Sequence, residues 1–321
     1  MMKPCNHTPI TLLSFGGGQD STCILYKIIL DPGFRAKWVT GELIVVMANT
    51  GNEHPHTYRH VRYIKQLCKQ HRIPFYLLTS KMGYHPTTWK SLIHQFKRNN
   101  TVMSVAFPRS CSDNLKIKPI YNFLDHYIAT ERYGYTDSLP PRGKKYIKRF
   151  HAEGGCIRTL IGIAAGEESR IESHKSKQLT ATQLQLFKKT ANPFNSWMNK
   201  CIDKHYPLAE EGIDRQLAQN YIKSTGWNLP YPSNCMMCPF ISKIELLWLY
   251  KNYPESFYLW KELERRKIEK NAGRTVRNLG VKGEHLLDEI LRQAIEEFGH
   301  LSDEQLDEYK MSHGHCVKSK F

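Results

Sequence analysis

The sequence contains no apolar run close to the roughly 18 residues that a membrane span needs. Its first residues, Met1 to Cys5, lead into no signal-peptide core. No internal repeat or low-complexity tract stands out either. These absences exclude a membrane-spanning chain and a repeat array, so we expect a globular, cytoplasmic protein with no membrane partner.

Acidic residues are scarce. The chain has 30 Asp and Glu against 46 Lys and Arg, a formal net charge of +16. The imbalance is strongest over residues 81–160, and within it the basic segment 130–150 interleaves cations with aromatic rings at Tyr133, Tyr135 and Tyr146. Cations beside stacking surfaces are typical of nucleic-acid binding, so we expect an RNA or DNA partner at segment 130–150. A solvated basic loop is the alternative.

Two common phosphate-binding motifs are also missing. There is no G-x-x-x-x-G-K-[ST], and G-x-G-x-x-G does not fit because Gly16, Gly17 and Gly18 are consecutive. Instead, an apolar run leads into these glycines and then into Gln19-Asp20-Ser21-Thr22. We call residues 14–22, from Ser14 to Thr22, the glycine loop. Glycines allow close approach of a ligand, and Asp20, Ser21 and Thr22 are predicted to cap the following helix. The loop therefore predicts a phosphate cradle, with an ordinary strand-to-helix turn as the alternative.

Hydrophobic patterning predicts an α/β fold with a doubly wound, mainly parallel sheet and a helical C-terminal region. The expected strands are 10–15, 43–48, 74–79 and 159–164, and the expected helices are 20–30, 57–71, 244–253, 257–272 and 284–298. We expect a nucleotide-binding domain over 1–245, with a basic insertion around 130–155, and a helical region over 246–321. Ligands bind at the carboxyl edge of such sheets, where the glycine loop would lie.

The glycine loop resembles the S-G-G-x-D-S pyrophosphate loop of the adenine nucleotide alpha hydrolase superfamily, the PP-loop ATP pyrophosphatases. Gly16 stands where Ser is usual, and Gln19 stands where Lys is common. Four further segments are similar to the phosphoadenosine phosphosulfate reductase-like branch and its nucleic-acid sulfur-transfer relatives. They are residues 49–57, 111–119, 162–170 and 234–240. Asn49 and Ala164 replace an acid and an arginine of the usual patterns.

The resemblance implies a Rossmann-like fold that binds ATP and Mg²⁺, with the metal near Asp20. The phosphates would lie on the glycine loop at Ser14, Gly16, Gly17, Gly18, Gln19, Asp20, Ser21 and Thr22. Met47, Ala48 and Asn49 would present backbone groups to the adenine. Gly162 and Ile163 would close over the base or ribose, and Arg170 would contact a phosphate.

The chain has nine cysteines. In a protein that we expect in the cytoplasm, they indicate thiols or metal ligands more than a disulfide framework. Cys235 and Cys238 form a single C-x-x-C, so one metal centre needs further ligands. Cys111 is the leading third ligand and Cys156 a possible fourth. A [4Fe–4S] cluster, zinc, a redox dithiol and buried thiols all stay open. We interpret Cys23, Cys68 and Cys201 as core or surface residues of helices.

These features lead to the hypothesis of an ATP-dependent enzyme that adenylylates a substrate, releases pyrophosphate and then transfers sulfur, with nucleic acid as the expected target. Asp20, Cys111, Cys235 and Cys238 are the candidate catalytic residues, and a sulfur-donor protein is a possible partner. One alternative is a sulfonucleotide (PAPS or APS) reductase. The E-C-G-[IL]-H motif of that family is missing, and the segment around Cys316 contains similar residues in a different order. Another is a non-catalytic nucleotide- or nucleic-acid-binding protein on a degenerate scaffold.

Overall fold

The structure is a computed structural model that describes residues 7–106, 110–175, 194–275 and 277–312. The chain forms two compact units, and neither is continuous in sequence. The first comprises Met1–Met47, Tyr63–Leu77 and Ile120–Leu229, and the second comprises Ala48–Arg62, Leu78–Pro119 and Pro230–Phe321. A boundary at residue 245 therefore does not separate the two units.

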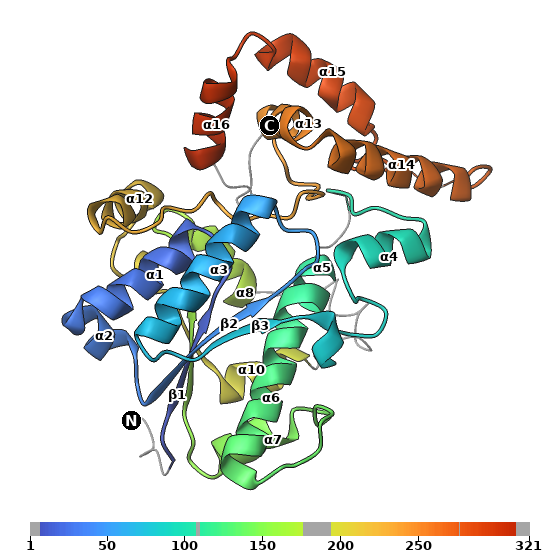
Figure 1. The fold of residues 1–321 in the computed structure, drawn as a ribbon. Helices are drawn as coiled ribbons and strands as arrows, with labels where there is room; N and C mark the ends of the chain where they lie inside the picture. The colour runs from blue at the N-terminus through green and yellow to red at the C-terminus, as the bar shows by residue number, and fades with distance from the viewer. Residues whose placement is uncertain (1–6, 107–109, 176–193, 276, 313–321) are drawn as a thin grey trace. The chain divides into compact units, whose positions relative to one another are not determined.

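A five-stranded parallel sheet, in the order β3-β2-β1-β4-β5, organises the first unit (Figure 1). Its strands are β1 (Ile10–Ser14), β2 (Glu42–Ala48), β3 (Phe75–Leu78), β4 (Ile157–Ile161) and β5 (Asp203–His205). β1 pairs with β2 on one side and with β4 on the other, in register from Ile10 onward. Apolar side chains on β1, β2 and β4 are almost fully buried, which is expected for a sheet covered on both faces.

Helices connect these strands and follow the last of them. They are α1 (Gln19–Leu30), α2 (Pro32–Trp38), α3 (Pro55–Gln70), α6 (Lys118–Tyr133), α7 (Lys145–Ala152), α8 (Glu168–Lys175), α10 (Phe194–Cys201), α11 (Pro207–Glu210) and α12 (Arg215–Ser224). α1 packs against α12, and the two run in the same direction: both begin beside the turn 162–165, and farther along Lys27 lies over the ring of Tyr221. The amino ends of both helices therefore lie beside the end of β1.

The second unit is mainly helical. It contains the 3-10 turn η1 (Ser80–Met82), α4 (Leu92–Asn99), α5 (Ser110–Ser112), the π-helical turn η2 (Asp113–Ile117), α13 (Lys243–Asn252), α14 (Pro254–Lys270), α15 (Leu287–Phe298) and α16 (Asp303–Ser312). α13 packs on α14, α15 and α16. Phe96 and Leu115 share one core with Leu246, Trp260 and Leu287, so the C-terminal helices and the 78–119 segment belong together.

The structure confirms the predicted fold class. All four expected strands and all five expected helices are present, displaced by up to three residues at their ends. β4 begins earlier than expected, at Ile157, and ends at Ile161 because the chain turns there, with Ile163 N–H donating to the Ile161 carbonyl. Within the described ranges, no helix is both long enough and apolar enough to cross a membrane.

Candidate functional site

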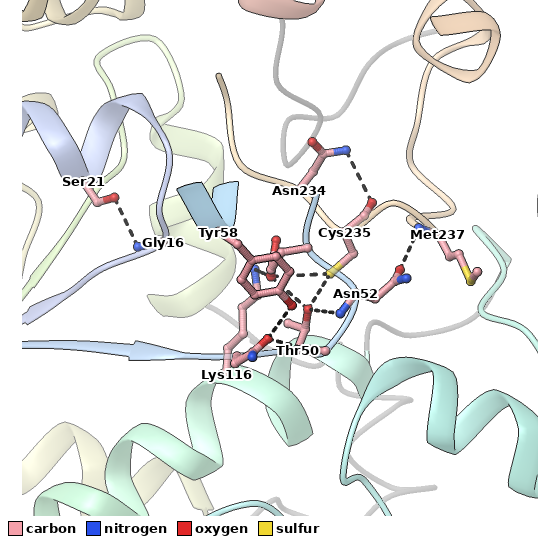
Figure 2. Close-up of polar contacts among 12 residues, drawn as sticks. Gly16, Ser21, Thr50, Asn52, Tyr58, Lys116, Asn234, Cys235 and Met237 are labelled. Carbon is pink, nitrogen blue, oxygen red and sulfur yellow. Dashed lines mark hydrogen bonds and ion pairs between the residues drawn. The ribbon is translucent and has the colours of Figure 1, made fainter. Parts of the chain in front are cut away.

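The glycine loop lies where β1 ends and α1 begins. Phe15 still donates to the Val46 carbonyl of β2, and Gly17 then takes a φ of 75°, which strongly favours glycine. The Ser21 hydroxyl closes the loop, because it accepts from the Gly16 N–H at 3.1 Å and lies 3.3 Å from the Gly18 carbonyl (Figure 2). This contact holds the glycines in a tight turn over the start of the helix.

The predicted capping of α1 is wrong. The helix begins at Gln19, one residue earlier than expected, so Asp20, Ser21 and Thr22 are inside it and Gly18 is the N-cap, without a side-chain cap. The first turn of a helix offers N–H groups that have no acceptor within the helix. A helix end that no side chain caps suits an anionic ligand.

Gly162 is the point where the end of β4 meets the first turn of α1. A Cβ at residue 162 would lie 2.9 Å from the Ser21 backbone nitrogen and 3.1 Å from the Asp20 Cβ. The chain runs from β1 outward through β2 and β3 and then returns to the other side of β1 as β4, so the strand order reverses between β1 and β4. Open α/β sheets bind ligands at the carboxyl ends beside such a switch point.

Four charged side chains surround the start of α1. Burial raises the pKa of Asp20 to about 6, Arg215 and Arg170 lower it, and Glu167 raises it. Glu167, itself buried, forms ion pairs with Arg170 and, at 2.6 Å, with Arg215. Arg170 was predicted as a phosphate contact. Arg215 was missed, because it is almost 200 residues away from the loop in sequence.

Asn49 has structural partners within its own unit. Its side-chain oxygen accepts from the Gly51 N–H and from the Tyr58 hydroxyl, both at 2.8 Å. Its backbone N–H donates to Leu78, and its carbonyl lies 3.1 Å from His85 Nε2. The predicted contact of Met47, Ala48 and Asn49 with adenine stays a prediction.

The second unit holds a pocket lined by three cysteines. Cys111, Cys235 and Cys238 all border it, together with Lys116 and apolar side chains, and its cavity volume is about 60 Å³. Cys111 lies on α5, just before the π-helical turn η2. The three cysteines predicted as metal ligands therefore line one cavity.

Cys235 lies in a network of polar side-chain contacts (Figure 2). Its thiol donates to the Thr50 hydroxyl at 3.3 Å, and that hydroxyl donates to Glu53 Oε1 at 2.9 Å. Lys116 Nζ lies 3.9 Å from the same carboxylate oxygen. Burial and the Glu53 charge raise the pKa of Cys235 well above its ordinary value, while Lys116 opposes this. Burial also raises the pKa of Cys111.

Backbone contacts fix the C-x-x-C segment. Met236 N–H donates to the Asn52 carbonyl and Met237 N–H donates to the Asn52 side chain, at 2.8 and 2.9 Å. On the other side, the buried Lys310 donates to Asn234 at 2.8 Å and to Glu245 at 3.2 Å. The turn 50–53 and helix α16 thus both anchor the residues around Cys235.

The three thiols are not gathered around one point. Among the described residues, no group of three or more His, Cys, Asp or Glu side chains is placed to hold a metal ion. Cys156, the possible fourth ligand, belongs to the first unit, where it precedes β4 and its carbonyl accepts from Ile10. Its sulfur is in a disulfide, so it could bind a metal only after reduction. Its role as a ligand stays a prediction. Cys316 lies outside the described residues.

The basic segment 130–150 lies at the opposite end of the sheet from the glycine loop. Tyr133 donates to Glu153 at 2.7 Å, and His7, just before β1, lies 3.6 Å from the same carboxylate. α7 thus meets the amino ends of β1 and β4. A five-residue strand spans about 15 Å, which separates this surface from the loop within the unit.

The surface of α7 is rigidly held and strongly basic. The buried Asp125 accepts from the Tyr146 and Ile147 N–H groups, at 2.9 and 2.8 Å, and so caps the helix from α6. Lys145 and Lys148 are exposed, as are Arg142, Arg149 and Lys200. The Tyr146 ring contacts the rings of both Tyr133 and Tyr135. Lys200 comes from α10, which packs against α7, so the local sequence around α7 does not indicate it.

Comparison with known proteins gives little. No family model matches the chain, and no curated protein matches it. Among solved structures, the chain is similar to the U34-tRNA thiolase NcsA from Methanococcus maripaludis, which was solved with its [4Fe-4S] cluster. The match has 13% identity and a TM-score of 0.37, and it covers 92% of this chain and 75% of the thiolase chain. A likeness of this degree carries no argument about what this chain binds.

Proposed function

We propose that the chain binds ATP at the glycine loop and uses it to adenylylate a nucleic-acid substrate for sulfur transfer. The observation that supports this most is the position of the loop. It lies at the carboxyl end of β1, beside the switch point with β4, where α1 begins without a side-chain cap. Those are the conditions for binding a polyphosphate.

In the proposed reaction, a carbonyl oxygen of a base attacks the α-phosphorus of ATP. The bond to the bridging oxygen breaks, and pyrophosphate leaves. A sulfur nucleophile then attacks the carbon, and AMP departs with the former carbonyl oxygen. N–H groups of the glycine loop would stabilise the charge on the leaving pyrophosphate. The ionised Asp20 would hold Mg²⁺, which is a hard cation that prefers oxygen ligands.

Cys111, Cys235 and Cys238 are the proposed ligands of a [4Fe–4S] cluster, which when bound would supply an iron site for the sulfur. Their thiols border one cavity without converging on a single point. Lys116 would balance part of the negative charge of the thiolates.

The surface of α7 would bind the nucleic acid at some distance from the reacting base. The exposed cations of α7 are suited to phosphates of the backbone, and such contacts position a nucleic acid without reading its sequence. Because this surface lies at the amino ends of the strands, the proposal favours a folded or extended substrate over a mononucleotide.

The test is ATP-dependent incorporation of labelled sulfur. The anaerobically purified protein is supplied with radioactive sulfide, with or without ATP, and with RNA in one arm and DNA in another. The proposal expects label in one nucleic acid, only with ATP. Tight binding of ATP with no label in either arm supports the non-catalytic alternative. In a separate reaction with an adenylyl sulfate and a dithiol reductant, release of sulfite supports the reductase.

A further inference from the structure

The glycine loop has no cation of its own. Residues 14–22 contain no Lys or Arg, and Asp20 adds a negative charge. A triphosphate carries three to four negative charges, and proteins that bind one surround it with cations as well as N–H donors. The question is therefore which side chains of the first unit bring positive charge to the start of α1.

Two arginines do so, and one acidic residue links them. Arg170 forms an ion pair with Glu167 Oε2, and Arg215 Nη2 lies 2.6 Å from Glu167 Oε1. The Glu167 side chain is 8% exposed, whereas both arginine side chains are 28% exposed. The carboxylate is thus covered by the two guanidinium groups, which themselves reach solvent.

Arg215 is placed by the fold and not by neighbouring sequence. It is the first residue of α12, whose N-cap Asp214 accepts from Leu217 N–H. The preceding Ile213 carbonyl accepts from Ala165 at 2.9 Å, which ties the start of α12 to the turn after β4. The same turn after β4 begins at Gly162, where a Cβ would lie 2.9 Å from the Ser21 nitrogen, and α12 packs against α1. The start of α12, and with it Arg215, therefore lies beside the first turn of α1.

We propose that Arg215 and Arg170, held as a pair by Glu167, bind the terminal phosphates of the nucleotide at the glycine loop. This inference rests on the proposed ATP site and names its cations. A guanidinium has five N–H donors in a fixed fork, so each arginine can keep its bond to Glu167 and still donate to a phosphate oxygen. The pair supplies charge that the loop residues lack.

The competing interpretation is a structural ion-pair network that touches no ligand. The two interpretations differ in how loss of the arginine changes the affinity for ligands with different numbers of phosphates. A phosphate contact strengthens binding of ATP and inorganic pyrophosphate and leaves adenosine unaffected, whereas a damaged fold weakens all three.

The experiment measures dissociation constants of ATP, inorganic pyrophosphate and adenosine by calorimetry for wild type, Arg215→Ala, Arg215→Lys and Arg132→Ala. Arg132 is the matched control, because it forms a 2.7 Å ion pair with Glu42 at similar exposure but at the amino end of β2. Thermal unfolding of each variant monitors folding.

We expect Arg215→Ala to weaken ATP and pyrophosphate about 10- to 100-fold, the usual effect of losing a hydrogen bond between charged groups, with adenosine changed less than about threefold. Arg215→Lys should fall in between, and Arg132→Ala should bind like wild type. Unchanged ATP affinity in Arg215→Ala, or an equal loss for adenosine, overturns the inference while the ATP site stands. Binding of pyrophosphate that depends on Arg215, with no binding of ATP to wild type, overturns the proposed function and supports the anion site.

Discussion

Gly162 and Ser21 touch through their backbones: a Cβ at residue 162 would lie 2.9 Å from the Ser21 nitrogen. The contact joins the end of β4 to the first turn of α1, where the proposal places the phosphates. Because the obstructing atom is backbone, the clash cannot be relieved by turning a side chain.

Gly162→Ala should therefore destabilise the protein by about 1–3 kcal/mol, the usual cost of overpacking, and weaken ATP binding. Gly33→Ala is the control, because its Cβ would meet only the Asp31 side chain at 3.3 Å and alanine favours a helix. Chemical denaturation and nucleotide titration measure both effects. A Gly162→Ala variant as stable as wild type would show that the two segments can separate without cost.

Asp20 should make stability depend on pH. Its folded pKa of about 6 lies above the ordinary aspartate value of 3.8, so its contribution to stability is fully favourable below pH 3.8 and is lost as the pH rises through 6. Asp20→Asn removes this loss and should raise the free energy of unfolding at pH 8 by up to about 3 kcal/mol relative to wild type. The difference should shrink toward pH 5. A constant difference across this range would contradict a titrating Asp20.

Binding of Mg·ATP should depend on pH in the opposite sense to stability, and be tighter at high pH. If Mg²⁺ is held by the ionised Asp20, the affinity for Mg·ATP falls as the pH drops below about 6, whereas the affinity for ATP without Mg²⁺ does not fall for this reason. Titrations at pH 5 and pH 8 with and without Mg²⁺ measure the difference. The same fall in both series would place Mg²⁺ elsewhere.

The strands and long helices could be predicted because each carries its own signal, a short apolar run or a 3.6-residue period. β5 could not, because Asp203–His205 is a three-residue edge strand without an apolar run. The cysteine pocket was predicted in part: the C-x-x-C spacing indicated Cys235 and Cys238, but Thr50 and Glu53 reach Cys235 only after folding. Arg215 could not be predicted either, because it comes close to the glycine loop only after folding.

The thiols of the pocket should be required for metal. Protein purified without oxygen should contain iron and sulfide in equal amounts, and both Cys235→Ala and Cys111→Ala should lose them. Cys201→Ala is the control, since that thiol is buried in α10 of the first unit. Zinc in place of iron would contradict the cluster, and iron retained in Cys235→Ala would contradict the proposed ligands.

The surface of α7 should bind nucleic acid through its phosphates. The double variant Lys145→Ala/Lys148→Ala should lower the slope of log affinity against log salt by about 2 for duplex DNA and somewhat less for single strands. Lys251→Ala/Lys261→Ala is the control, because both lysines form ion pairs with acids in the second unit. An unchanged slope in the α7 variant would show that nucleic acid binds elsewhere.

The most direct test of the central claim identifies the products of ATP. ATP labelled in the α- and γ-phosphates is incubated anaerobically with Mg²⁺, sulfide and nucleic acid, with wild type and with Asp20→Asn. The account predicts AMP and pyrophosphate in equal amounts from wild type and almost none from the variant. ADP and phosphate, or AMP and pyrophosphate formed equally by both proteins, would contradict it.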